Sequence, residues 1–340
     1  MEMKVGIAGA GLLGRLLAWQ LSKAGWGVTL FDKDDKSGRK STAYAAAGML
    51  SPVAECEIAE QIIFNLGNYS LRKWPLWLSS LNQPVYFKQN GSIVISHSHD
   101  EVEKERWLKK ISCKIKDFSL EKLSSSALQR LEPELNFDEG YYLPQEAHLD
   151  SRALMQALEK ELNVEWYSKT FVDNVVPYRI LTKEKSYQFD CIFDCRGVGA
   201  GKMFSDLRSV RGELIYLHAP DVHLNRPIRL LHPRYRLYIV PRAHHIYLIG
   251  ASEIESNDIS PISVRTCLEL LSAVYSVHPG FSEARIIETI TALRPTLPDN
   301  LPRIHYQPGL IAINGLYRHG FLIAPALIDE VIHNLSRGIK

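Results

Sequence analysis

The sequence has no long apolar run, which excludes a membrane-spanning helix. Charge-free apolar stretches such as Val5–Gly14 and Gly320–Ile328 fall far short of the roughly 20 residues that a bilayer requires. The opening segment MEMKVGIAGAGLLGRLLAWQL is apolar enough to suggest a signal peptide, but Arg15 interrupts it and no small-residue cleavage site follows. We therefore interpret this segment as part of the fold.

Cysteine is scarce, and its pattern excludes a zinc site. The five cysteines are odd in number and lack paired short spacings. Two of them, in FDCIFDC, are predicted to lie on one strand. We expect reduced thiols, a cytoplasmic protein and no metal. The cysteines are Cys56, Cys113, Cys191, Cys195 and Cys267.

The chain also has little net charge. Its 40 Lys and Arg residues against 38 Asp and Glu residues leave +2, too little to indicate a nucleic acid as partner. No internal repeat or low-complexity segment is present. What the chain does have is 340 residues with 46% apolar content, enough for two substantial domains or two lobes around one ligand.

The chain begins with the pattern of a βαβ unit: a strand at Lys4–Ala8, a helix at Leu12–Ala24 and a strand at Gly27–Asp32. The first turn, GIAGAGLLG, has glycines in the G-x-G-x-x-G spacing of a dinucleotide-binding loop. These glycines permit a tight turn, the approach of a pyrophosphate and close packing of helix on strand. Asp32 is placed to accept hydrogen bonds from the ribose hydroxyls of an adenosine. The motif alone leaves NAD, NADP and FAD open.

Two further features favour FAD. The second strand is followed by an unusually small-residue segment, Gly38–Pro52, which lets a large flat ligand lie against the backbone. Its alanines and Met49 are too apolar for a flexible linker. The sheet is also interrupted early and rejoined near residue 165, a split topology that suits an elongated buried cofactor.

Periodicity and caps predict the other elements. Asp150 is in the N-cap position of a helix over Ser151–Leu162, and Glu55–Leu81 predicts one or two helices. From Arg211 onward, alternating residues predict an antiparallel sheet with one helix at about Ile262–Val277. The remaining predictions are strands at Gly91–Ser96, Val164–Tyr167, Thr170–Val176, Tyr187–Cys195, Arg211–His218, Tyr235–Arg242, His245–Ser252, Ala284–Leu293 and Gly309–Gly315, and a helix over about Ala324–Leu335.

Five motifs give the chain a family resemblance. STAYAAAGMLSP, RGE, YIVPR followed by YLIGAS, ALRPTLPDNLPRI and NGLYRHGFLIAPAL occur in the order seen in FAD-dependent amine and D-amino-acid oxidases. Within that family the chain most resembles the glycine oxidases of bacterial thiamine biosynthesis. The resemblance implies an α/β fold with two domains: a Rossmann-like FAD domain with a split sheet and an antiparallel-sheet substrate domain. The expected ranges are 1–80, 140–210 and 295–340 for the first domain, and 81–139 and 211–294 for the second.

The resemblance implies noncovalent FAD and assigns residues to it. Gly315 and Gly320 would let the backbone pass close to the isoalloxazine ring, and the helix predicted near Ala324 would aim its positive end at the N1–C2=O edge. The residues expected to contact FAD are Gly9, Gly11, Leu12, Leu13, Gly14, Asp32, Lys33, Ser41, Thr42, Ala45, Ala46, Ala47, Gly48, Met49, Val172, Gly197, Arg318, His319, Gly320, Phe321 and Leu322.

The resemblance also assigns the substrate residues. Arg294 in ALRP corresponds to the arginine that pairs with the substrate carboxylate, and its planar fork suits both oxygens. Tyr238 and Arg318 correspond to two other lining residues. Glu253 stands where glycine oxidases carry a methionine, so it could receive the substrate ammonium, favour a larger or cationic amine, or face solvent.

The implied activity is oxidative deamination of glycine, sarcosine or small D-amino acids. Hydride would pass from Cα to flavin N5, giving an imine that hydrolyses to a 2-oxo acid, with ammonia or an amine and H2O2 as the other products. The alternatives are a D-amino-acid dehydrogenase with an acceptor other than oxygen, and an enzyme acting on an aminomethyl group of modified tRNA uridine. A role in thiamine biosynthesis and a homo-oligomer are also compatible with the resemblance.

Overall fold

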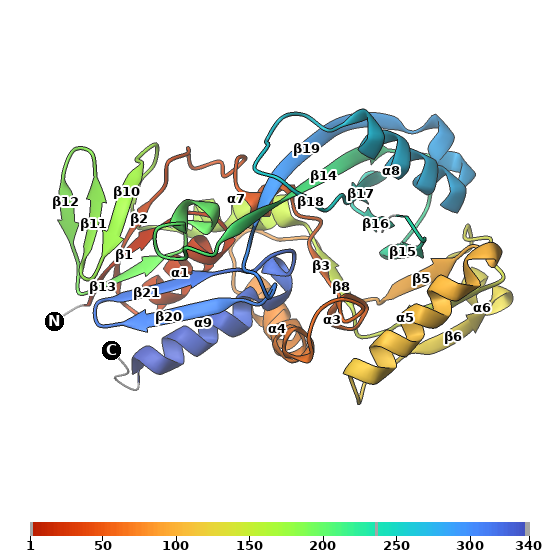
Figure 1. The fold of residues 1–340 in the computed structure, drawn as a ribbon, viewed down its shortest axis with the longest axis horizontal. Coiled ribbons are helices and arrows are strands. Elements are labelled where there is room, and N and C mark those ends of the chain that lie inside the picture. Colours follow the sequence, from red (N-terminus) through yellow and green to blue (C-terminus); the bar gives the residue numbers. More distant parts are fainter. Residues whose placement is uncertain (1–2, 235–236, 337–340) are drawn as a thin grey trace.

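Two large sheets organise the structure, a computed structural model that describes residues 3–234 and 237–336 (Figure 1). The first sheet has six strands in the order β20-β21-β13-β1-β2-β9. All neighbours from β21 to β9 are parallel, and β20 is antiparallel to β21. Its strands are β1 (Lys4–Ala8), β2 (Gly27–Phe31), β9 (Glu165–Tyr167), β13 (Cys191–Asp194), β20 (Arg303–Gln307) and β21 (Leu310–Asn314).

Helices from distant parts of the chain pack on this sheet and on one another. α1 (Leu12–Lys23) contacts α7 (Ser151–Glu161) and α9 (Gly320–Ser336), and α9 packs on α4 (Gln61–Ser79). The predicted βαβ unit is confirmed. So is the start of α7, where the Asp150 carboxylate accepts hydrogen bonds from the backbone N–H of Arg152 at 2.9 Å and of Ala153 at 3.0 Å.

The arginine that interrupts the first apolar run is fully buried. Arg15 donates hydrogen bonds to the carbonyl oxygens of Ala10 at 2.8 Å, Met155 at 2.8 Å and Lys36 at 2.7 Å. These three carbonyls belong to the glycine-rich turn, to α7 and to the loop after β2. Because a buried guanidinium requires hydrogen-bond acceptors, Arg15 fixes these three segments relative to one another.

The second sheet has nine strands and follows the order β18-β14-β17-β16-β15-β5-β7-β6, with β19 also paired to β14. Its pairs are antiparallel except β5 with β15. The helices α5 (Glu101–Lys114), α6 (Ser125–Leu131) and α8 (Val264–Val277) pack against it. Its strands are β5 (Ser92–Ser96), β6 (Glu121–Ser124), β7 (Glu139–Leu143), β14 (Arg208–His218), β15 (Ile228–Leu231), β16 (Leu237–Pro241), β17 (Ile246–Gly250), β18 (Ile254–Glu255) and β19 (Arg285–Thr296).

The predicted antiparallel region is confirmed in β14, β16, β17 and β19, with α8 between them in the chain. The first two residues of the strand predicted at Tyr235–Arg242 lie outside the described residues. α8 begins two residues later than predicted because Ser263 is its N-cap, with Oγ accepting the Thr266 N–H at 3.1 Å.

Two short sheets complete the fold and correct two predictions. The strand predicted at Thr170–Val176 begins two residues later, and this strand, β10 (Val172–Val176), pairs with β11 (Arg179–Thr182) in a separate three-stranded sheet. Tyr187–Cys195 is not one strand. It divides into β12 (Ser186–Gln188) and β13 because Asp190 leaves the hairpin to exchange two hydrogen bonds with the backbone of Lys4. The other short sheet contains β3 (Met49–Leu50), β8 (Ala147–Leu149) and β4 (Phe87–Lys88).

The last helix begins at Gly320, so the predicted start near Ala324 is wrong by four residues. Pro325 therefore lies inside the helix and cannot donate to the Phe321 carbonyl. The indole N–H of the buried Trp74, on α4, donates to that carbonyl at 2.9 Å instead. This bond satisfies the group freed by the proline and lets the helix extend back to the glycine.

No helix within residues 3–234 and 237–336 combines the length and apolarity needed to cross a membrane. All five cysteines are free thiols. Across the same described ranges, no group of three or more His, Cys, Asp or Glu side chains is arranged to hold a metal ion.

Replacing Trp74 with phenylalanine should lower the thermal unfolding midpoint more than replacing Trp107 does. Both tryptophans are fully buried, but the Trp107 N–H has no partner among the described residues. The Trp74 variant leaves a buried carbonyl unpaired, at an extra cost of about 1–3 kcal/mol. Calorimetry of both variants measures the difference, and equal losses would contradict the role given to Trp74.

Candidate cofactor and substrate site

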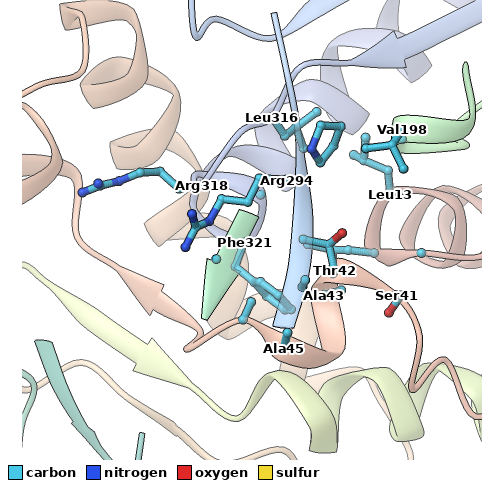
Figure 2. Close-up of a pocket in the computed structure, with 18 of the residues that line it drawn as sticks. Leu13, Ser41, Thr42, Ala43, Ala45, Val198, Arg294, Leu316, Arg318 and Phe321 are labelled. Atoms are coloured by element: carbon cyan, nitrogen blue, oxygen red, sulfur yellow. The ribbon is translucent and has the colours of Figure 1, made fainter. Parts of the chain in front are cut away.

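A cavity of about 380 Å³ is lined by residues from both large sheets. Arg294 and Arg318 lie on one side of it, and Leu13 and Val198 lie on the other (Figure 2). Every residue that the sequence analysis assigned to cofactor or substrate lines this cavity except Gly14 and Gly315. The expectation for Gly315 is wrong: this glycine has φ +76° and packs against the Leu297 side chain, where a Cβ would lie 2.6 Å away. Ligand sites of small molecules are commonly of this size and are shared between domains.

The glycine-rich turn at the start of α1 fits a pyrophosphate. Gly9 has φ +98°, a left-handed conformation that favours glycine. A Cβ on Gly14 would lie 1.8 Å from the Gly9 carbonyl oxygen, whereas one on Gly11 would meet only open space. The amides of Leu12 and Leu13 have no hydrogen-bond partner in the described part of the chain. The turn therefore combines an open approach with free donors at a positive helix end.

On the side of the cavity next to the glycine-rich turn, backbone amides hold the carboxylate of Asp32 in place. Asp32 accepts hydrogen bonds from the backbone N–H of Ala10 at 2.5 Å and of Asp34 at 2.8 Å, and it lines the cavity together with Lys33. This geometry fixes the carboxylate beside the glycine turn, where a ribose would lie in the predicted complex.

A second carboxylate, Asp194, positions Arg196, an arginine that the sequence analysis did not identify. The fully buried Asp194, at the end of β13, pairs with Arg196 at 2.7 Å, and Arg196 donates to the Val172 carbonyl at 3.2 Å. Val172 and Gly197 are thereby held at the cavity wall. The sequence contains one signal for this pair. Asp194 is the last residue of a strand of the parallel sheet, and Asp32 directly follows another such strand.

Side-chain hydroxyls fasten the small-residue segment. Ser41 caps the short helix α2 (Thr42–Ala45), and the Thr42 hydroxyl donates to the Leu293 carbonyl at 2.7 Å. The Ser151 hydroxyl donates to the Ala46 carbonyl at 2.6 Å. Gly48 has φ +66°, and a Cβ there would lie 2.1 Å from the Leu149 carbonyl oxygen. The segment is packed against both sheets, and Ser41, Thr42 and Ala45 through Met49 all line the cavity.

The first turn of α9 also faces the cavity. Gly320, Phe321 and Leu322 line it, and their amides have no hydrogen-bond partner among the described residues. His319, which precedes the helix, is 3% exposed, and its Nδ1 lies 3.3 Å from Glu55 Oε2. A second positive helix end is therefore available for the electron-rich edge of a ligand.

Two glycines provide space for the substrate residues Arg294 and Tyr238. A Cβ on Gly212 would lie 2.3 Å from Arg294 Nη2, and a Cβ on Gly250 would lie 2.6 Å from the Tyr238 hydroxyl oxygen. Arg294 donates to the Ser252 carbonyl at 3.0 Å and has no carboxylate partner among the described residues. Burial raises the pKa of Tyr238, against the lowering effect of Arg294 and Arg318. Arg294 is thus a cation whose charge is available to a ligand.

Arg318 is held by a buried carboxylate that the sequence did not indicate. Glu55 Oε2 lies 2.6 Å from Arg318 Nε, and Glu55 Oε1 lies 3.0 Å from Arg318 Nη2 and 2.7 Å from Arg229 Nη2. Burial alone would raise the pKa of Glu55, but the two guanidiniums outweigh it and hold that pKa well below the usual value. A lone glutamate and a lone arginine, distant in sequence, leave no local pattern that could predict this pair.

Glu253 contacts the same arginine while remaining exposed to solvent. Its carboxylate contacts Arg318 Nη1, and the side chain is 30% exposed. Glu253 is thus an exposed residue that also contacts an arginine of the cavity wall. Arg318, in turn, contacts two carboxylates.

Comparisons with known proteins agree with this geometry. The family model described as FAD dependent oxidoreductase matches residues 4–332. The chain is 37% identical over 335 residues to a protein of Rhizobium etli named as a thiamine biosynthesis oxidoreductase, ThiO, covering 98% of this chain and 96% of the relative. It is 23% identical over 354 residues to a glycine oxidase of Bacillus licheniformis, covering 96% and 92%. The crystal structure of glycine oxidase from Bacillus cereus matches with a TM-score of 0.86 at 22% identity, covering 100% of this chain and 98% of that one. These matches confirm the fold and the family expected from the motifs.

The glycine turn gives a paired prediction. Gly14→Ala should destabilise the FAD-free protein by about 1–3 kcal/mol, because the methyl group meets a backbone oxygen. Gly11→Ala should cost at most about 1 kcal/mol of stability but weaken FAD binding at least about tenfold, because its methyl group enters the path of the pyrophosphate. Thermal unfolding and fluorescence titration with FAD separate the two effects. A Gly11 variant with unchanged FAD affinity would refute the assigned approach.

Proposed function

The chain belongs to the family of FAD-dependent oxidoreductases, and we propose that its substrates are small amino acids and secondary amines with one carboxylate, such as glycine, sarcosine and small D-amino acids. It is an FAD-binding enzyme that acts on CH–NH groups. The observation that carries the proposal is Arg294, a guanidinium on the cavity wall that faces no carboxylate of the described chain.

Arg294 would bind the substrate carboxylate. Its Nη1 is held by the Ser252 carbonyl, so the side chain is oriented before a ligand arrives. Gly212 leaves room for the guanidinium plane against β14. An arginine fork can bond both carboxylate oxygens, and two bonds fix the rotation of the substrate about its Cα. Tyr238, on the adjacent wall, would limit the room left for a side chain on Cα.

The residues present suit the loss of a hydride from the substrate Cα better than the removal of a proton from it by a side chain. Two carboxylates that line the cavity, Glu55 and Glu253, both contact Arg318, and such contacts favour the charged, weakly basic form of a carboxylate. A substrate that enters with a neutral amine needs no base, since its nitrogen lone pair stabilises the cation left at Cα. FAD, when bound, supplies the two-electron acceptor. Water then hydrolyses the imine product.

Oxygen is proposed as the final acceptor, with H2O2 as product, and the pathway proposed is thiamine biosynthesis. The support for the pathway is the name of the Rhizobium etli relative together with 37% identity over 98% of this chain. The support for oxygen is the similarity to proteins named glycine oxidase. No residue contact favours an RNA substrate over a small one.

The division into an FAD domain and a substrate domain is also a proposal. All six strands of the first sheet fall within 1–80, 140–210 and 295–340. Most of the second sheet falls within 81–139 and 211–294, but β7, β14 and β19 each run past a boundary. Limited proteolysis of the FAD-free protein tests these boundaries.

Anaerobic mixing of the FAD-loaded protein with glycine, sarcosine, D-alanine or D-proline should bleach the visible flavin absorbance. Admission of air should restore the absorbance and produce H2O2. Bleaching without recovery in air, followed by recovery with a quinone, would replace oxygen with another acceptor. Absence of bleaching by all four compounds would refute the proposed substrate class.

Arg294→Ala should leave FAD bound and reduce kcat/KM for the best substrate by about 100-fold or more, because two charge-assisted hydrogen bonds are lost. Most of the loss should appear in KM. The matched control is Arg303→Ala, which removes an arginine on β20 that pairs with Asp206 at 3.1 Å outside the cavity. Unchanged kinetics in the Arg294 variant would refute its role.

A further inference from the structure

Arg318, the second arginine assigned to the substrate site, already has carboxylate partners. Arg318 gives its Nε and Nη2 to Glu55, while its Nη1 contacts Glu253. Glu55 and Arg318 are largely buried, with side chains 13% and 16% exposed, whereas Glu253 is 30% exposed. One carboxylate is therefore built into the protein interior, and the other reaches the arginine from the open side.

We infer that Arg318 is a second carboxylate subsite, kept closed by Glu253, so that this residue restricts the enzyme to substrates with one carboxylate. The inference rests on the proposed function, since it extends the substrate site around Arg294. The ligand class that the subsite would take is the second carboxylate of an amino or imino dicarboxylic acid.

The charges around Tyr238 agree with this restriction. The charged side chains that act on the pKa of the Tyr238 hydroxyl also line the cavity; they are Arg294, Arg318, Glu55 and Arg229. With Glu253 added, three guanidiniums face two carboxylates among the described residues, leaving one positive charge. A substrate with one carboxylate and a neutral amine matches that charge. A second substrate carboxylate would have to displace Glu253 from Arg318 or remain beside it unpaired.

Removing the charge of Glu253 should open the subsite without losing the arginine. Glu55 holds Arg318 through Nε and Nη2, and Arg229 holds Glu55 at 2.7 Å, so neither contact depends on Glu253. Nη1 then becomes available beside the second N–H of Nη2. This edge of a guanidinium is one that binds a carboxylate through two parallel hydrogen bonds. The subsite is thus preformed.

The test compares substrates that differ by one carboxylate. Sarcosine is compared with iminodiacetate, and D-alanine with D-aspartate, in the FAD-loaded wild type and in Glu253→Gln. In the variant, KM for both dicarboxylic substrates should fall by roughly tenfold to a hundredfold, the factor that one charge-assisted hydrogen bond supplies. The quantity compared is the ratio of KM for each dicarboxylic substrate to KM for its monocarboxylic partner, because the loss of the Glu253 charge can also change the monocarboxylic values; this ratio should fall by the same factor.

The matched control is Glu255→Gln. Glu255 lies two residues along the chain, pairs with Arg208 and does not line the cavity, so the variant should keep wild-type selectivity. If Glu253→Gln does not fold, Glu253→Met, with a neutral side chain of similar length, provides the second variant. Flavin content and the thermal unfolding midpoint establish that each variant is folded.

A binding measurement separates the inference from the proposed function. Perturbation of the flavin spectrum gives dissociation constants for acetate and malonate, neither of which is oxidised. A larger gain in affinity for malonate than for acetate in Glu253→Gln supports the subsite whether or not any substrate turns over. Equal affinities in wild type and variant, with acetate bound by both, would overturn the subsite alone. Failure of the wild type both to bind acetate and to oxidise any of the four substrates would overturn the proposed function and the subsite together.

Discussion

The largely buried carboxylate of Glu55, between two guanidiniums, connects the parts of this fold. Glu55 ends α3 (Pro52–Glu55), Arg229 lies on β15 of the nine-stranded sheet, and Arg318 precedes α9 on the six-stranded sheet. A buried pair of this kind adds little stability compared with an apolar core, but removing one partner typically costs about 3–5 kcal/mol because an unpaired charge remains. The ion pairs therefore act mainly on geometry: they define how the start of α9 faces the antiparallel sheet, and so where the cavity opens.

Local patterns predicted the part of the fold that depends on neighbouring residues. The βαβ unit, the Asp150 cap and the strands from Arg211 onward follow from periodicity and capping within short windows. Predictions failed where a distant contact decided the outcome. The strand predicted over Tyr187–Cys195 is interrupted because Asp190 forms hydrogen bonds with Lys4. The helix α9 begins early because the Trp74 indole N–H donates to the carbonyl that Pro325 cannot reach with an N–H of its own. In both cases the partner lies far away in the sequence.

The candidate site divides in the same way. Its motif residues, from Gly9 to Leu322, gather on one cavity because motifs mark close approaches of backbone to ligand. Glu55, Arg229 and Arg196 were missed, since a single charged residue is most often a solvated one and only folding reveals its partner. Gly212 was visible in the RGE motif, but its purpose becomes clear only when the Arg294 side chain lies over it from the neighbouring strand.

The hydrogen bond from Thr42 to the Leu293 carbonyl joins the small-residue segment to the residue next to Arg294. This hydrogen bond couples the position of the segment to that of the strand, by at most the roughly 0.5–1.5 kcal/mol that one such bond contributes. Coupling between two binding sites is reciprocal. If a cofactor bound along the small-residue segment raises the affinity of Arg294 for a carboxylate by some factor, a bound carboxylate raises the affinity for the cofactor by the same factor. Through this hydrogen bond, the Thr42 hydroxyl connects the binding of the cofactor to the binding of the substrate carboxylate.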